Sequence, residues 1–171
     1  STAPAGDEAQ LAAMEAARLA DPENRLLWRM NPRRLSFEEW RDTILQSSGE
    51  LNLAIGGRAK ELFPAHDKNV RRTLYGLVDR QFLNPAMRVF DFANPDLHIP
   101  QRSETTVSQQ ALFAMNHPFV AEQARSLVAR VEAEAAGDPM KLAARLYRAA
   151  FQRDPSESER QAAIDFLAAT A

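Results

Sequence analysis

Two adjacent threonines and an arginine in the middle of the sequence have the chemistry of an anion site. Arg102 lies three positions before Thr105-Thr106, and apolar residues at helical spacing follow. We predict that Thr105 or Thr106 caps a helix, whose first amide groups and positive dipole end would face the anion. Arg102 could add the paired donors that suit a sulfate, phosphate or carboxylate. The structural alternative is a simple cap, with Arg102 paired to Asp91 or Asp96.

A second arginine, Arg71, could face the same ligand. Residues 70–80 fit either a helix or a half-buried strand, and we favour the strand because a glycine within the segment weakens a helix. In a strand, Arg71 and Tyr75 would point to one face and could bind the anion together. The alternative is that Arg71 pairs with a carboxylate such as Asp91, while Arg72 is solvated.

Three further residues complete a predicted polar network: Asp91, Gln110 and Asn116. Gln110 and Asn116 lie six positions apart, so they fall on different sides of a regular helix. They could share a site only if the helix ends between them. The alternative is that both amides bond to loop backbone, as buried amides generally do.

The sequence predicts neither a metal site nor a bound cofactor in this segment. His66, His98 and His117 have no helical pairing with one another and no carboxylate at ligand spacing, and the chain has no cysteine. Gly56-Gly57 lacks the lysine that follows in a phosphate-binding loop. Nucleophile-elbow and zinc-protease motifs are missing as well, so no catalytic residue is predicted.

Composition is that of an ordinary globular domain. Of 171 residues, 45% are hydrophobic and 26% are charged, with a formal net charge of -2. This charge gives no general attraction to nucleic acid or to an anionic membrane surface. No apolar run approaches the roughly 20 residues of a membrane helix. The serine start and the small residues after it suggest a piece of a longer protein.

Apolar periodicity predicts a mainly α fold: a helical bundle with an irregular central polar insert and one short β element at 70–80. We expect a tail or linker over residues 1–6 and a single helical domain over 7–171. The predicted helix caps are Asp7, Asp21, Ser36 with Glu39, Asn84, Asp138 and Ser156. The predicted helices run over about 7–20, 22–31, 37–48, 85–91, 105–116, 118–136, 139–150 and 157–171, and the long loops over 51–65 and 93–104.

From about Asn24 to its end, the sequence resembles a PSD-type domain of unknown function, found towards the C-terminus of large planctomycete proteins that also contain cytochrome-c-like domains. The family often has proline after Thr-Thr-Val, where this chain has Ser108. The matching blocks are Asn24 to Asn31, Arg33 to Leu35, Glu39 with Arg41-Asp42, Ser47 to Leu51, Arg71 to Thr73 with Tyr75, Phe90-Asp91, Arg102-Ser103, Thr105 to Val107, Gln110 to Leu112, Asn116, Pro118 to Val120, Gln123-Ala124, Leu146 to Arg148, Arg153 to Pro155, Glu157 and Glu159.

The resemblance implies a periplasmic, cell-envelope or extracellular setting and haem only in neighbouring domains of the same polypeptide. It implies no known activity. Our first hypothesis is a non-catalytic interaction or docking module that binds those neighbours. The alternative is a domain that binds or processes an anionic glycan, sulfated or carboxylated, with Arg71, Arg102 and the helix start at Thr105-Thr106 holding the charged group.

Overall fold

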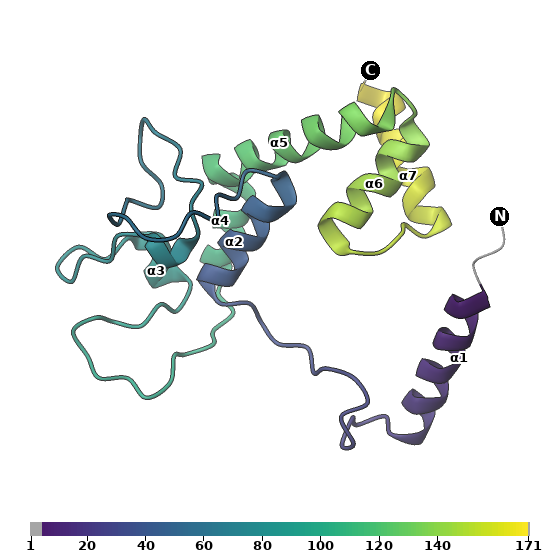
Figure 1. Cartoon of the computed structure of the whole chain (residues 1–171), viewed down its shortest axis with the longest axis horizontal. Coiled ribbons are helices and arrows are strands. Elements are labelled where there is room, and N and C mark those ends of the chain that lie inside the picture. Colours follow the sequence, from purple (N-terminus) through teal and green to yellow (C-terminus); the bar gives the residue numbers. More distant parts are fainter. Residues whose placement is uncertain (1–4, 171) are drawn as a thin grey trace. The chain divides into compact units, whose positions relative to one another are not determined.

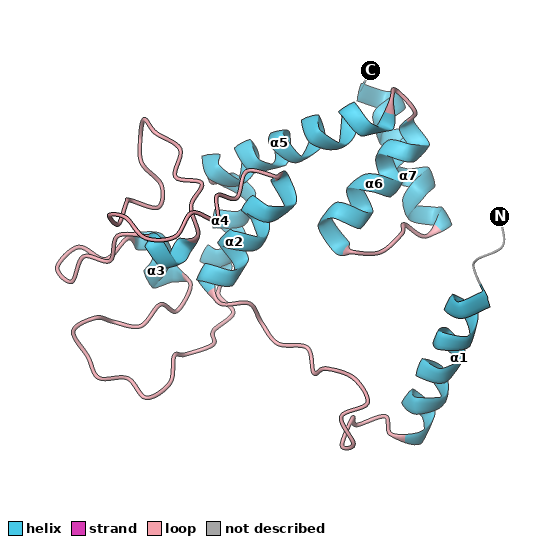
Figure 2. Cartoon of the chain, in the orientation of Figure 1, coloured by secondary structure: helices cyan, strands magenta, loops and turns pink. Residues whose placement is uncertain are grey.

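A computed structural model describes residues 5–170, which form seven α-helices and one short 3-10 turn. Contacts divide the chain into two compact units, one ending at Arg34 and the other beginning at Leu35. Figure 2 shows helices joined by long loops, with no strand in the described part of the chain. The predicted mainly helical fold is confirmed. Residues 1–4 of the predicted tail lie outside the described residues.

The first unit contains one helix, α1 (Ala5–Ala20). It begins two residues before Asp7, so the prediction that Asp7 caps this helix is wrong. Ala5 and Gly6, which we assigned to the tail, belong to α1. Seven of its 16 residues are alanine, the residue with the highest intrinsic helix propensity.

The predicted second helix, over residues 22–31, does not form. The Asp21 carboxylate instead accepts hydrogen bonds from the Arg25 and Leu26 amides, at 2.9 and 2.7 Å. Asn24 has a left-handed backbone with φ 56°, and its side-chain amide donates to the Arg29 carbonyl at 2.8 Å. The carboxylate oxygens bond to two amides that would otherwise donate to helix carbonyls, and this bonding stabilises a turn in place of a helix.

The second unit is built along α5. Figure 1 shows α2 and α4 beside the first part of α5, with α6 and α7 at its other end, and the helix contacts agree. No helix among the described residues has the length and apolar character needed to cross a membrane. The elements are α2 (Phe37–Ser48), η1 (Thr73–Tyr75), α3 (Pro85–Val89), α4 (Ser108–Asn116), α5 (Pro118–Ala135), α6 (Pro139–Phe151) and α7 (Glu157–Thr170).

Four of the predicted helix starts in this unit are confirmed by their hydrogen bonds. The Ser36 hydroxyl accepts from the Glu39 amide at 3.3 Å, and the Ser36 amide donates to the Glu39 carboxylate at 2.9 Å. Ser156 repeats this reciprocal arrangement at the start of α7. Asn84 and Asp138 cap the helices that begin at the following prolines. These caps satisfy amides that the helix itself leaves without a partner.

The predicted strand over residues 70–80 is wrong. Only two isolated parallel bridges form, Asn52 with Arg71 and Lys60 with Gly76, and a 3-10 turn lies between them. A Cβ on Gly76 would meet Leu62 Cδ2 at 2.4 Å, so the chain passes too close to a core residue for any larger side chain. This close approach explains a glycine that sequence reasoning used only as evidence against a helix.

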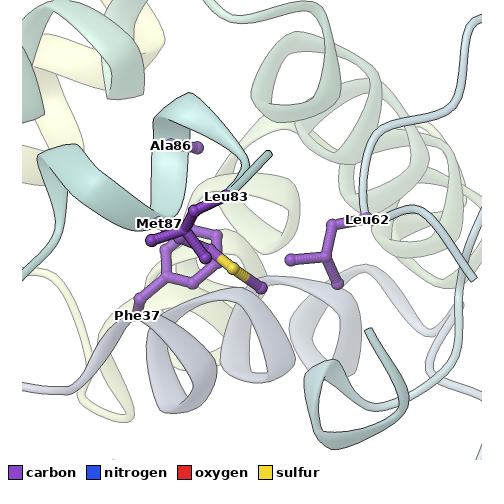
Figure 3. Close-up of a cluster of buried hydrophobic side chains, with 5 residues drawn as sticks. All are labelled: Phe37, Leu62, Leu83, Ala86 and Met87. Carbon is purple, nitrogen blue, oxygen red and sulfur yellow. The ribbon is translucent and has the colours of Figure 1, made fainter. Parts of the chain in front are cut away.

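The core of this unit lies where α2, α3 and a loop residue meet. Figure 3 shows Phe37 from α2 and Met87 from α3 converging on Leu62. An aromatic shell surrounds these side chains, formed by Trp40, Phe63, Phe90, Phe92 and Phe113. The ring centroids of Trp40 and Phe90 are 5.2 Å apart, within the range of favourable aromatic packing.

A carboxylate joins the end of α2 to α5. Gln123 and Ser126 of α5 donate to the Glu50 carboxylate at 2.9 and 2.8 Å. The Ser48 hydroxyl donates to the Gln123 side-chain oxygen at 2.5 Å, and Lys68 pairs with Glu50 at 3.2 Å. These donors stabilise the charged form and lower the pKa of the Glu50 carboxyl, with the Gln123 hydrogen bond as the largest cause.

Candidate functional site

Arg71 and Tyr75 lie in contact, although their segment is a turn and not a strand. The Arg71 guanidinium lies over the Tyr75 ring, 4.2 Å from its centroid. It donates hydrogen bonds to the carbonyl groups of Ala54, Gly56 and Arg58. The Tyr75 hydroxyl accepts from the Gly56 amide at 3.2 Å. The two side chains therefore hold the neighbouring loop in place. The Arg71 donors that we predicted would bind an anion bond to loop carbonyls instead.

The glycine pair in that loop now has a structural explanation. Gly56 and Gly57 have φ values of 79° and 88°, a region that residues with a Cβ rarely adopt. A Cβ on Gly57 would lie 3.4 Å from Arg71 Nη1, in van der Waals contact with the guanidinium. The turn and the guanidinium thus fit together closely.

We call residues 52–60 and 70–82 the loop layer. Two isolated bridges and the Arg71 hydrogen bonds connect its segments. Ile55 beside the glycine turn is 93% exposed, and Leu74 in η1 is 70% exposed. Other large apolar side chains of the layer are exposed as well: Leu53, Leu77, Val78 and Phe82.

Arg102 lies elsewhere in the unit and has a different partner from those predicted. Its Nη1 atom donates to both carboxylate oxygens of Glu38, at 2.8 and 2.9 Å, and its guanidinium lies 4.5 Å from the Phe92 ring centroid. Pairing with Asp91 or Asp96 is therefore wrong, and Asp96 pairs with Arg80 at 2.5 Å. Arg102 ties the loop before α4 to the first turn of α2.

Thr105 and Thr106 do not cap α4. The Thr105 amide and hydroxyl each donate to the Asp91 carboxylate at 2.8 Å. This bonding holds the chain extended, and the helix begins only at Ser108, with Val107 in the N-cap position. The Val107 amide donates to the Gln110 side chain at 3.3 Å. Thr106 is exposed. The predicted donor face of a helix beside Arg102 does not form.

The remaining members of the predicted network bond locally. Gln110 is buried and donates to the Val89 carbonyl at 2.8 Å, so it does bond to backbone. Asn116 donates to the Leu112 carbonyl of its own helix at 2.9 Å. Within residues 5–170, no hydrogen bond or ion pair connects Arg71 to Arg102 or to Thr105. The predicted polar centre is a set of separate local networks.

The most buried cation of the second unit was missed by sequence reasoning. Arg41 of α2 has 0% exposure and donates to the Arg71 carbonyl at 2.9 Å, to the Thr73 hydroxyl at 3.1 Å and to the Leu62 carbonyl at 3.4 Å. It also donates to the carbonyl of Asn69. Burial lowers the pKa of the Arg41 guanidinium to about 10, although the nearby Asp42 carboxylate acts to raise it. Because this pKa is still well above 7, the guanidinium is charged at neutral pH.

A sequence signal for Arg41 did exist. Phe37, Arg41 and Leu45 recur every four residues and share the inward face of α2, where an arginine must find acceptors. The next residue, Asp42, accepts from the Thr73 amide at 2.6 Å and hydroxyl at 2.7 Å. Asp42 also pairs with Arg72 at 3.4 Å, so Arg72 has a partner in addition to solvent. Arg41 and Asp42 of α2 therefore hold residues 71–73 of the loop layer in place through hydrogen bonds.

A cleft of about 510 Å³ opens between residues 62–70 and the first turns of α5. Phe63 and Phe119 line it, and both rings also pack against the Arg41 guanidinium, at 5.7 and 5.3 Å. His117 lines it too, and its Nδ1 accepts the Phe119 amide at 3.2 Å. Burial lowers the pKa of His117, which favours the neutral imidazole with its proton on Nε2.

No group of three or more histidine, aspartate or glutamate side chains in the described part of the chain is placed to hold a metal ion.

The chain matches the protein family PSD1, described as a protein of unknown function (DUF1553), over residues 8–167. This match begins well before Asn24, where the sequence resemblance started. No curated protein and no solved structure matches the chain.

Proposed function

The chain belongs to the PSD1 family, whose function is unknown, and we propose that it is a non-catalytic docking module of an exported multidomain protein. The observation that carries this proposal is the loop layer, where large apolar side chains are exposed on a backbone that Arg41, Arg71 and Tyr75 hold in place. The exported setting and the cytochrome-c-like neighbours are expectations from the family resemblance.

The exposed apolar residues support an interface. Ile55, Leu74 and Phe82 are each more than two-thirds exposed, at 93%, 70% and 79%. Several exposed apolar side chains in one region of a soluble protein commonly mark a surface that another protein covers. Burial of each large apolar side chain contributes about 1.5–3 kcal/mol, so a few of them are enough for a useful contact.

The fixed backbone supports the same function. A loop that must become ordered on binding loses conformational entropy, which reduces affinity. In the loop layer, guanidinium-carbonyl hydrogen bonds order the segments before any partner arrives. The partner we propose is a neighbouring cytochrome-c-like domain of the same polypeptide. A tethered partner is present at a high effective concentration, so even a weak interface would be occupied.

The anionic-glycan alternative stays a prediction. The Arg71 guanidinium donates to three carbonyl groups and the Arg102 guanidinium to Glu38, so each already has internal acceptors. This bonding supports a structural role for Arg71, Tyr75, Arg102 and Thr105 over a ligand-binding one. A sulfated or carboxylated sugar that raises the melting temperature of the wild type, but not of Arg102→Ala, would favour the alternative.

The docking proposal can be tested with the chain and its natural neighbouring domain as separate proteins. We expect measurable binding by calorimetry, and at least tenfold weaker binding for the double variant Ile55→Ser, Leu74→Ser, because each loses a buried anchor at the interface. Met115→Ser is the matched control, since Met115 is 79% exposed on α4 and outside the loop layer. Equal binding by the double variant and the control would contradict the proposal.

A further inference from the structure

A second cavity lies between α2, α5 and α6. Its lining is rich in charged side chains, whereas the loop layer exposes apolar ones. Its volume is about 520 Å³. Three arginines line it: Arg130 from α5, and Arg145 and Arg148 from α6. The neutral amide side chains of Gln46 and Gln152 also line it. We call this the arginine cavity. Its walls are packed helices, which hold side chains more firmly than loops do.

Two of these arginines have a carboxylate partner. Arg145 pairs with Glu134, which also lines the cavity. Arg148 donates to both oxygens of Asp154, at 2.5 and 2.9 Å, and Asp154 lies outside the lining. These pairs account for one positive charge each. They also leave part of each guanidinium unused, because a guanidinium has five N–H donors.

Arg130 is different, since its only partner in the described part of the chain is a neutral group. Its Nη2 atom donates to the Ser47 carbonyl at 2.6 Å, near the end of α2. This hydrogen bond uses one of the five N–H donors of the guanidinium, and a neutral carbonyl does not neutralise its charge. The cavity therefore has an excess of positive charge centred on Arg130, in a chain whose net charge is -2.

We infer that the arginine cavity binds an oxyanion, a sulfate or phosphate group, with Arg130 of α5 as its principal donor and with Arg145 and Arg148 of α6 as further donors from the same lining. Guanidinium groups bind such oxyanions through paired, charge-assisted hydrogen bonds. A cavity of about 520 Å³ is in the usual range for small-molecule sites and leaves room for more than one anionic group. The anion can therefore be a free ion or an ester on a larger ligand such as a sugar.

Calorimetric titration of the full chain would test this inference. The ligands are sodium sulfate, sodium phosphate and a monosaccharide 6-sulfate, with the unsulfated sugar as blank and sodium chloride keeping the ionic strength constant. We expect saturable binding to the wild type and at least tenfold weaker binding to Arg130→Gln. The matched control is Arg125→Gln, which removes an exposed arginine of α5 that does not line the cavity.

The outcomes separate the possible sources of the anion. Tighter binding of the sugar sulfate than of inorganic sulfate supports the site and identifies an ester as the ligand. Equal binding of the two supports the site and identifies the free ion. No saturable binding, or the same loss of binding in Arg130→Gln and Arg125→Gln, overturns the inference. None of these outcomes affects the docking proposal, because no partner domain is present.

Discussion

The three helices α5 to α7 and the loops before α4 are ordered by different chemistry. In the helices, short side chains at the ends satisfy nearby amides, as Asp138 does for Met140 and Lys141. In the loops, long arginine side chains satisfy carbonyls that are distant in sequence, as Arg41 does for Leu62. Helix caps act within one turn, whereas the contacts of Arg41 with the Leu62 and Arg71 carbonyls span 21 and 30 positions. The loops thus depend on a few side chains in a way that the helices do not.

The largest expected effect comes from removing the arginine that the loops share. Arg41→Met leaves the carbonyls of Leu62, Asn69 and Arg71 without their donor. Because a buried acceptor without a partner costs about 1–3 kcal/mol, we expect the free energy of unfolding to fall by about 3 kcal/mol. Relief of the buried charge offsets part of the loss. Urea denaturation would measure the difference.

Arg41→Lys is the control for this variant. A lysine keeps the positive charge but has one compact donor group in place of a planar fork, so it cannot reach acceptors on several loop segments. We expect a stability between those of the wild type and Arg41→Met. If Arg41→Met were as stable as the wild type, the loop carbonyls would be hydrated and the contrast between the two regions would fail.

A helix cap should matter less than Arg41. Ser36→Ala removes the hydroxyl that accepts from the Glu39 amide, and such substitutions typically cost about 1 kcal/mol. We expect a correspondingly small fall in the urea midpoint, with the helical circular dichroism retained. A loss as large as that of Arg41→Met would show that α2 depends on its cap as strongly as the loops depend on their arginine.

The smallest effect should appear in the pH dependence of stability. The folded pKa of Glu50 is below its ordinary value of 4.5, so its charged form stabilises the native state above that pH. As pH falls through the lower folded pKa, this contribution is lost. We expect the stability difference between wild type and Glu50→Gln to shrink on acidification, measured by urea denaturation in steps below pH 4.5. A constant difference would contradict a paired carboxylate.

Sequence reasoning succeeded where a structure is determined within a few residues. Ser36 with Glu39, and Asp138 before Pro139, begin helices because the cap and the amides that it satisfies lie within one turn. The same reasoning failed at Thr105. The Thr105 hydroxyl donates to Asp91, 14 positions away in the sequence, and does not cap a helix. No local pattern contains that partner.

The candidate site shows the same limit. The sequence placed Arg71 near Tyr75, and they are in contact, but it could not show that carbonyls of residues 54–58 would take up the guanidinium. Carbonyl acceptors leave no mark in a sequence, since every residue has a backbone carbonyl. Arg41 was the exception. Its position on the apolar face of α2, four residues from both Phe37 and Leu45, is a sequence signal of a buried cation, although our prediction missed it.

The two tryptophans of the chain lie in different units, which gives the protein a built-in optical probe for each. The Trp28 indole donates to the Asp21 carbonyl at 2.8 Å in the first unit, whereas Trp40 packs among phenylalanine rings in the second. Replacing either one with phenylalanine would leave fluorescence that reports on a single unit. Comparing the denaturation curves of the two variants would show whether both units unfold in one cooperative step.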